Sequence, residues 1–324
     1  MKNNHSVSYL LIITGMTLFL TTCAKEGDPK NEVLTPTEED PDTTIMSVLT
    51  HKLTDEISAD TLESLVVWLE GMGTRYALAD NHRDVAENIK RRFIMIGYPD
   101  TRLDSFMISN QQWQYNVIAV LAGNANPDSV CIIGAHYDDR LMPGDMTKIV
   151  PGANDNASGI AAAIELARVM KKNNYLPLNT IEFIAFADEE FGICGSKAYA
   201  EQAIRSAKKI KMMLNNDMIA YQPGTNSSDW VVNIMDYDNS HGLRKEAEQM
   251  CSKFTVLRFT NDNTNNEKSD SYRFFSNGYR ALFFSSNKFE PEYYHSLNDV
   301  SGNCNFEYCS EIVKISCALL VYNN

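Results

Sequence analysis

Apolar residues recur with two different periods along this chain, and the alternation between those periods predicts an α/β fold. Residues 82–97 and the stretch that begins at Ser158 place apolar side chains at helical spacing. Residues 129–135 and 180–187 are instead continuously apolar, which is typical of strands covered on both faces. Over the whole chain we expect strands at 102–108, 115–122, 129–135, 180–187, 209–214, 230–235, 254–258 and 280–285, and helices at 46–70, 82–97, 158–172, 195–206, 241–252, 269–276 and 306–322. Strands that alternate with helices predict a three-layer α/β/α fold with a largely parallel central sheet.

The first 45 residues lack this pattern. Tyr9–Leu20 form an apolar run that is shorter than the ~20 residues needed to span a bilayer. The run predicts a signal peptide over residues 1–23, and its end resembles a bacterial lipobox in which Cys23 is lipidated. Simple secretion with an ordinary cleavage site is the alternative. Residues 24–45 are rich in Pro, Asp, Glu and Thr, so we expect a disordered acidic tether there and one domain over residues 46–324.

Composition and the leader limit the partners and the location. The formal net charge is −13, which would repel a phosphate backbone, so we expect no nucleic-acid partner. A lipid on Cys23 would attach the chain to a membrane. The expected location is the cell envelope of a bacterium, as an outer-membrane, periplasmic or extracellular lipoprotein.

Acidic and imidazole side chains follow the predicted strands at the points where those strands end. His136 and Asp138 close one apolar strand, Glu189 and Glu190 follow the next, and Asp217 follows the strand after that. Side chains at the carboxyl ends of parallel strands converge on one crevice of an open α/β sheet. The sequence therefore predicts that these groups lie close together.

Two further residues in loops extend this set. Asp155 lies in the glycine-bearing segment PGANDNASG, and His295 lies in YYHSLND near the C-terminus. Imidazole nitrogen and carboxylate oxygen without thiolate suit catalytic rather than structural zinc. So many carboxylates together would repel one another strongly unless some were protonated or a cation were bound. No run of Lys or Arg lies nearby in the sequence, which favours a metal.

Read in order, the motifs GAHYDD, PGANDNASG, ADEEFG, NNDM and HSLND resemble those of the co-catalytic di-zinc aminopeptidases. That family includes bacterial leucyl aminopeptidase and aminopeptidase Y, with enzymes of the glutamate carboxypeptidase II type as relatives. The resemblance covers roughly residues 60–322 and implies a mixed eight-stranded sheet between helices. It also implies a zinc peptidase that removes N-terminal residues from peptides with two Zn²⁺ ions.

The resemblance also implies a role for each site residue. Asp155 would bridge the two metals, His136 and Asp217 would complete one site, and Glu190 and His295 would complete the other. Glu189 would be the general base, because a carboxylate beside a ligand can take a proton from water and pass it to the leaving amine. Asp138 would orient His136 by accepting a hydrogen bond from its second ring nitrogen.

Other functions remain open on the residues alone. A glutaminyl cyclase with one zinc, a carboxypeptidase or dipeptidase, and a non-catalytic surface-binding domain could all use this fold. The chain also departs from the family pattern where many members carry Ser-Asp-His, since Ser269-Asp270-Ser271 stands there. The missing histidine is not a metal ligand in that pattern, so we expect the chemistry to survive with altered substrate contacts.

Overall fold

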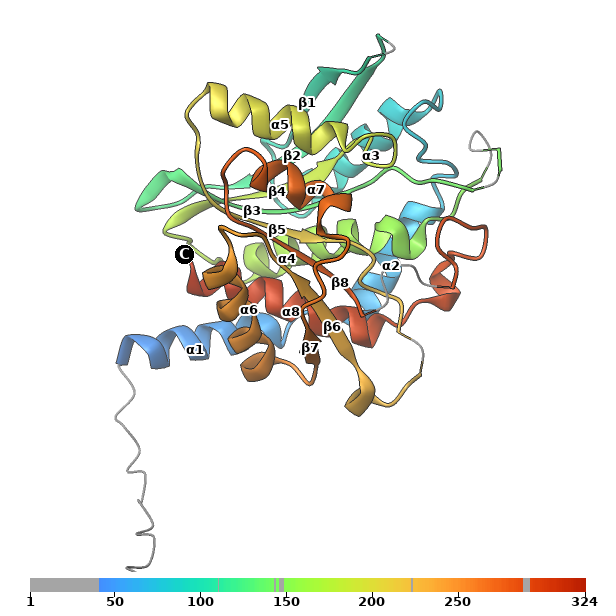
Figure 1. The fold of residues 1–324 in the computed structure, drawn as a ribbon. Coiled ribbons are helices and arrows are strands. Elements are labelled where there is room, and N and C mark those ends of the chain that lie inside the picture. Colours follow the sequence, from blue (N-terminus) through green and yellow to red (C-terminus); the bar gives the residue numbers. More distant parts are fainter. Residues whose placement is uncertain (1–40, 110, 143, 146–148, 223, 288–291) are drawn as a thin grey trace, which may run out of the picture. The chain divides into compact units, whose positions relative to one another are not determined.

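Eight strands form one mixed sheet in the computed structural model of the chain, in the order β1-β2-β4-β3-β5-β8-β6-β7 (Figure 1). The structure describes residues 41–324 except 110, 143, 146–148, 223 and 288–291. The strands are β1 (Arg102–Met107), β2 (Trp113–Leu121), β3 (Asn126–His136), β4 (Asn179–Phe186), β5 (Lys209–Asn216), β6 (Val231–Met235), β7 (Arg258–Thr260) and β8 (Ala281–Ser286). The α-helices are α1 (Pro41–Thr54), α2 (Ala59–Glu70), α3 (His82–Met95), α4 (Ser158–Lys172), α5 (Cys194–Arg205), α6 (His241–Phe254), α7 (Asp270–Phe275) and α8 (Phe306–Tyr322). The predicted signal peptide, Cys23 and the tether up to residue 40 lie outside the described residues.

The centre of the sheet is parallel and its edges are mixed. β4, β3, β5 and β8 run parallel to one another, whereas β1, β2 and β6 each pair antiparallel with a neighbour. The register places His136 opposite Phe186, and Gly134 opposite Asn215. The carboxyl ends of β3, β4 and β5 therefore meet at one edge of the sheet, as the sequence predicted.

Strand β3 shows why helices cover both faces of the sheet. Cys131, Ile133 and Ala135 point into the larger hydrophobic core, and Val130 and Ile132 point into a smaller one. This alternation follows from the two-residue period of a strand. The larger core includes side chains of α2, α3, α4, α6 and α8, and the smaller one includes side chains of α5 and α7. Helices α5 and α7 accordingly lie on one side of the sheet, with α4 and α8 on the other (Figure 1). The predicted three-layer α/β/α fold is confirmed.

Two predicted elements need correction. The helix expected over residues 46–70 is two helices, α1 and α2, because Ser58 caps α2 by accepting a hydrogen bond from the Thr61 backbone N–H. Helix α1 also begins at Pro41, earlier than the predicted end of the tether. The strand expected at 254–258 is displaced, because residues up to Phe254 continue α6 and β7 begins at Arg258.

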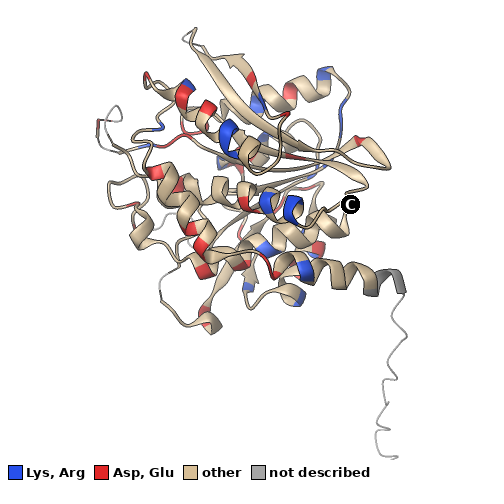
Figure 2. Cartoon of the chain, turned by 180° about the vertical axis from the view of Figure 1, so that it is seen from behind, with Lys and Arg blue, Asp and Glu red and all other residues tan. Residues whose placement is uncertain are grey.

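Both acidic and basic residues occur on the helices seen in Figure 2. Among the described residues, no helix is both long and apolar enough to cross a membrane. The cysteines at 131, 194, 251, 304, 309 and 317 are free thiols.

Candidate metal centre

The strand ends and two loops bring all five predicted metal-binding residues into one cluster. His136 ends β3, Glu190 follows β4, and Asp217 follows β5 directly. Asp155 comes from the segment before α4, and His295 comes from the loop between β8 and α8. Among the described residues, three groups of three side chains could each hold a metal ion. Two of these groups share Asp155, and the third joins His136, Glu189 and Glu190.

The first group joins His136, Asp155 and Asp217. His136 Nε2 lies 3.3 Å from Asp155 Oδ1 and 3.5 Å from Asp217 Oδ1. All three side chains are buried. Asp217 Oδ1 has no hydrogen-bond partner, although such buried atoms normally have one. An orphaned carboxylate oxygen aimed at an imidazole and a second carboxylate fits a bound cation.

The second group joins Asp155, Glu190 and His295. His295 Nε2 lies 3.2 Å from Asp155 Oδ2 and 3.0 Å from Glu190 Oε2. Asp155 therefore turns one oxygen toward each histidine. A carboxylate shared in this way can lie between two cations and offset their mutual repulsion.

The donor spacing and the charge of the cluster both fit zinc. Zinc bonds of 2.0–2.2 Å in a tetrahedron place two ligand atoms about 3.4 Å apart, and the four histidine–carboxylate distances are 3.0, 3.2, 3.3 and 3.5 Å. Four buried carboxylates share this space with two imidazoles, so divalent cations would offset the excess negative charge. Burial and the neighbouring Asp155 raise the pKa of Glu190 to about 8, which shows how costly these charges are without a cation.

Glu189 and Asp138, the predicted base and orienting residue, both lie beside His136. Burial, reinforced by nearby carboxylates, raises the pKa of Glu189 well above its usual range. Asp138 accepts hydrogen bonds from the backbone N–H groups of Glu189 and Glu190, at 3.0 and 3.1 Å. Its Oδ1 also lies 3.5 Å from His136 Nδ1, which contacts the Asp138 carbonyl at 3.1 Å. Asp138 thus contacts the imidazole through its carbonyl and the backbone of the two glutamates through its side chain.

Two glycines allow the Asp155 segment to pass close to its neighbours. Gly152 has φ +49°, and a Cβ there would lie 2.6 Å from an Arg75 nitrogen. A Cβ at Gly159 would lie 2.1 Å from the Asn216 carbonyl oxygen, so α4 packs against the end of β5 only with glycine at this position.

The structure adds positioning residues that the sequence reasoning missed. Asp299 Oδ1 and Oδ2 accept from the backbone N–H groups of Asn154 and Asp155, at 2.8 and 3.0 Å. Ser269 Oγ donates to Asp217 Oδ2 at 2.6 Å. Both residues stand in motifs recognised in the sequence, HSLND and Ser-Asp-Ser, so their positions were visible although their roles were not.

Arg75 and Tyr294 were also missed. The fully buried Arg75 donates to the carbonyls of Tyr137 and Gly152, both at 2.8 Å, and so ties the end of β3 to the Asp155 segment. No motif marks Arg75 in the sequence. The Tyr294 ring stacks on His295 with centroids 3.7 Å apart. Burial and the cluster carboxylates raise the pKa of Tyr294 well above its usual range, so its hydroxyl stays a neutral donor.

Comparison with known proteins agrees with this geometry. Leucine aminopeptidase 1 of Ajellomyces capsulatus is 27% identical over 285 residues, which are 83% of this chain and 72% of that protein. The solved structure of LapB from Legionella pneumophila has a TM-score of 0.73 at 22% identity, over 84% of this chain and 74% of that one. BSAP, a zinc aminopeptidase from Bacillus subtilis, has a TM-score of 0.54 at 25% identity over 66% and 51%. A glutaminyl cyclase from Bacteroides thetaiotaomicron has a TM-score of 0.67 at 15% identity over 83% and 99%, which shows a shared fold alone.

The fold and the cluster together are typical of one class, the α/β hydrolytic enzymes that use a metal. Residues 116–320 match Peptidase family M28, and the chain belongs to that family. The predictions of the fold, of the family and of a peptidase are confirmed.

Proposed function

We propose that the chain is an aminopeptidase that binds two zinc ions and hydrolyses N-terminal residues from peptides. The observation that carries the proposal is the pair of donor groups that share Asp155. Two of the similar proteins, a leucine aminopeptidase and a zinc aminopeptidase, support the proposal. His136 and Asp217 would hold one ion, Glu190 and His295 the other, and Asp155 both.

We assign each side chain around the cluster a step in peptide hydrolysis. Bound zinc ions would polarise the scissile carbonyl and make a water more acidic. Glu189 would accept the proton of the attacking water and deliver it to the leaving amine. The neutral Tyr294 hydroxyl could donate a hydrogen bond to the oxygen that gains negative charge. Asp138 holds the backbone of Glu189 and the ring of His136 in place.

Two alternatives on this fold fit the cluster less well. A glutaminyl cyclase with one zinc would need only one of the two donor groups, whereas this chain assembles both. A non-catalytic binding domain would not need Glu189 buried and placed beside His136 in the same cluster.

One observation favours a carboxypeptidase or dipeptidase as the second candidate. Arg140 donates through Nη1 to the Glu190 carbonyl at 3.0 Å, and its guanidinium lies over the Phe191 ring. A cation near the cluster could hold a substrate carboxylate. Arg140 already contacts the backbone and the aromatic ring, so its main role in this structure is structural.

A substrate panel tests the proposal. The panel contains aminoacyl p-nitroanilides, N-acetylated peptides, C-terminally amidated peptides and peptides with N-terminal glutamine, each with and without a chelator. We expect chelator-sensitive cleavage of substrates with a free N-terminus, whether or not the C-terminus is amidated. Cleavage that requires a free C-terminus would replace the proposal with a carboxypeptidase, and cyclisation of glutamine without hydrolysis would replace it with a cyclase.

We also propose that the enzyme acts in the bacterial cell envelope through a lipid on Cys23. The support is the apolar run and the Cys23 position in the sequence. Palmitate labelling of the full-length chain, with Cys23→Ala as the unlabelled control, tests this location.

A further inference from the structure

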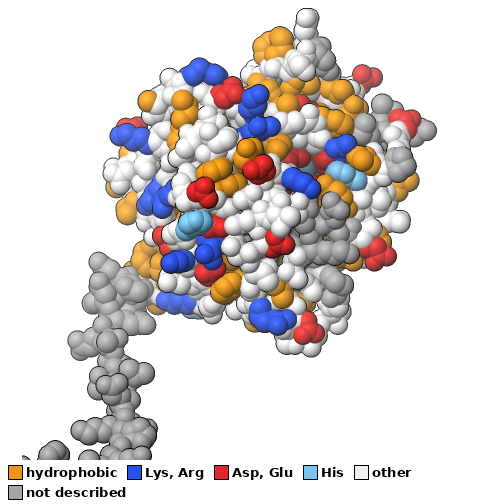
Figure 3. Space-filling view, in the orientation of Figure 1, with side chains coloured by type: hydrophobic (Ala, Val, Ile, Leu, Met, Phe, Trp, Pro, Cys, Tyr) orange, Lys and Arg blue, Asp and Glu red, His pale blue; other side chains and the backbone are white. Residues whose placement is uncertain are grey.

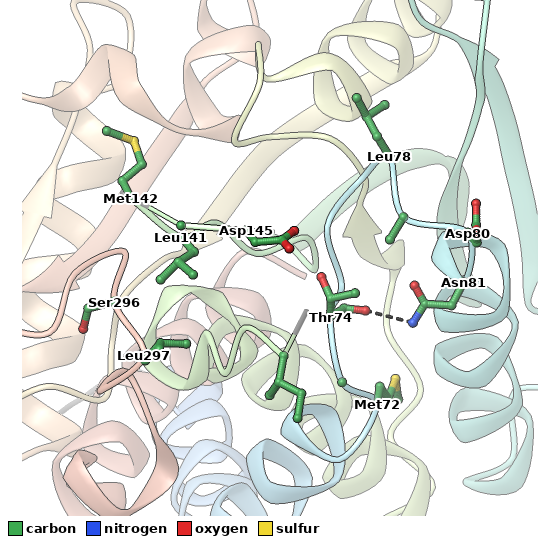
Figure 4. Close-up of a pocket in the computed structure, with 14 residues that line it drawn as sticks. Met72, Thr74, Leu78, Asp80, Asn81, Leu141, Met142, Asp145, Ser296 and Leu297 are labelled. Atoms are coloured by element: carbon green, nitrogen blue, oxygen red, sulfur yellow. Dashed lines mark hydrogen bonds between the residues drawn. The ribbon is translucent and has the colours of Figure 1, made fainter. Parts of the chain in front are cut away.

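An apolar groove runs beside the candidate metal centre. Its space of about 1270 Å³ is lined by residues from three segments: the loop between α2 and α3, residues 141–142, 144–145 and 149 after β3, and residues 296–297. Figure 4 shows Leu78 and Thr74 on one wall, with Leu141, Met142 and Leu297 on the opposite wall. None of the five predicted metal-binding residues lines the groove.

Large apolar side chains gather at this groove although water can reach them. Leu78, Met142, Ile149 and Leu297 are all exposed, with Met142 at 54% and Leu297 at 59%. Exposed apolar groups that are contiguous mark binding sites far more often than those that are scattered. Hydrophobic side chains also gather beside acidic and histidine side chains on the face seen in Figure 3.

Both walls are joined to the segments that carry the metal-binding residues. The Met142 backbone N–H donates to the His295 carbonyl at 2.9 Å, which fixes one wall to a predicted ligand. On the other wall, Arg75 ties the loop to the Tyr137 and Gly152 carbonyls, next to His136 and before Asp155. Asn81 Nδ2 donates to the Thr74 carbonyl at 2.9 Å and holds that loop folded (Figure 4). Hydrogen bonds therefore connect both walls of the groove to the segments that carry the metal-binding residues.

Size and charge indicate what occupies the groove. Its volume exceeds the roughly 300–1,000 Å³ that holds a drug-sized ligand, so it has room for more than one amino-acid residue. An aminopeptidase substrate has a single residue before the cleaved bond, so a longer occupant must follow that bond. The described lining residues include the exposed Asp80 and Asp145 and no Lys or Arg. That charge disfavours a terminal carboxylate and suits an uncharged stretch of chain.

We infer that this groove binds the residues that follow the cleaved bond, and that it selects peptides with large apolar side chains there. The inference rests on the proposed aminopeptidase function and names its substrate class. Each apolar side chain that leaves water for the groove stabilises the complex enough to change kcat/KM by about tenfold. Short free-acid peptides, whose carboxylate would face Asp80 and Asp145, should be poorer substrates than their amides.

The test compares Leu-Phe-Leu-amide with Leu-Ser-Asn-amide, which share the residue before the cleaved bond. With the full chain and bound zinc we expect kcat/KM to be about tenfold or more higher for the apolar peptide. Leu-p-nitroanilide with and without chelator reports the basal reaction. A ratio near one, with chelator-sensitive cleavage of the anilide intact, overturns the groove inference and leaves the proposed function standing. Loss of all cleavage overturns both.

Variants of groove residues then test whether the preference for apolar peptides arises in the groove. Leu78→Gln and Met142→Gln should each bring the ratio toward one. The matched controls Leu176→Gln and Met95→Gln, which change apolar residues 73% and 77% exposed outside the groove, should leave the ratio unchanged. A ratio that survives both groove variants assigns the preference to another surface and overturns the inference. The groove inference is also overturned if Met142→Gln leaves the ratio unchanged but converts a dimer to monomers in sedimentation. The groove would then be a contact between two copies of the chain.

Discussion

At the scale of single residues, the proposed mechanism assigns different roles to the adjacent Glu189 and Glu190. Asp138 accepts a hydrogen bond from the backbone N–H of each, so neither can shift without the other. The Glu190 carboxylate points toward His295. Glu189 and Glu190 both lie beside His136. In the proposed function, this arrangement would give metal binding to Glu190 and proton transfer to Glu189.

Replacing Glu189 with glutamine should remove the proton carrier and keep the metal. We expect Glu189→Gln to lower kcat by roughly 10²–10⁴-fold with an unchanged zinc content. Glu190→Gln is the matched control, and it should lose zinc as well as activity. Elemental analysis beside steady-state kinetics distinguishes the two. A Glu189→Gln enzyme with full turnover would show that the base assignment is wrong.

Ser269 should tune zinc affinity through Asp217. Its hydroxyl donates to Asp217 Oδ2 and accepts from Asn215 Nδ2, both at 2.6 Å. Loss of such an outer hydrogen bond costs about 10–100-fold in metal affinity. We therefore expect Ser269→Ala to weaken zinc binding by that factor in competition with a fluorescent chelator. Ser206→Ala, at an exposed helix end, is the control, and equal affinities for the two variants would contradict this role.

At the scale of elements, the positions of site residues at strand ends could be predicted from the sequence better than the contacts made by loop residues. The apolar runs of β3, β4 and β5 placed His136, Glu190 and Asp217 at one edge, since parallel strands align their carboxyl ends. The two helices within 46–70 were not separated because apolar spacing continues across the break, and the Ser58 cap becomes evident only in three dimensions. Arg75 was missed because most of the partners of its guanidinium are backbone carbonyls, which leave no mark on the side-chain pattern.

Arg75 should stabilise the arrangement of the loops more than any surface arginine. It is fully buried and also donates to the Pro151 carbonyl at 2.9 Å, with Asp139 3.6 Å away. Removing one member of a buried ion pair costs about 3–5 kcal/mol. We expect Arg75→Met to lower the free energy of unfolding by this amount, as measured by urea denaturation. The exposed Arg91→Met should lower the free energy of unfolding by only about 0.5 kcal/mol. Similar values for both variants would contradict the role of Arg75.

At the scale of the whole molecule, the buried acidic cluster couples folding to metal and to protons. Burial lowers the pKa of His295, but its hydrogen bonds with Asp155 and Glu190 outweigh burial and raise it to about 9. The pKa of Glu190 is also raised, to about 8. In the metal-free protein these residues keep protons that the unfolded chain releases at lower pH. The stability linked to Glu190 is therefore lost as pH rises from about 4.5 to about 8, and that linked to His295 as pH rises from about 6.5 to about 9.

Zinc should therefore stabilise the protein more at high pH. Metal binds the deprotonated side chains, so proton competition weakens as pH rises, and tighter binding raises the apparent stability. We expect the difference in Tm between zinc-loaded and chelator-treated protein to widen from pH 6 to pH 9. Differential scanning calorimetry measures it, and a difference that narrows over this range would contradict the account.

The zinc stoichiometry tests the central claim most directly. Chelator-treated protein is titrated with zinc while bound metal and cleavage of Leu-p-nitroanilide are followed together. We predict two zinc ions per chain, with full activity only when both are bound. Full activity at one ion per chain, or saturation at one ion, would contradict a centre built from two groups that share Asp155.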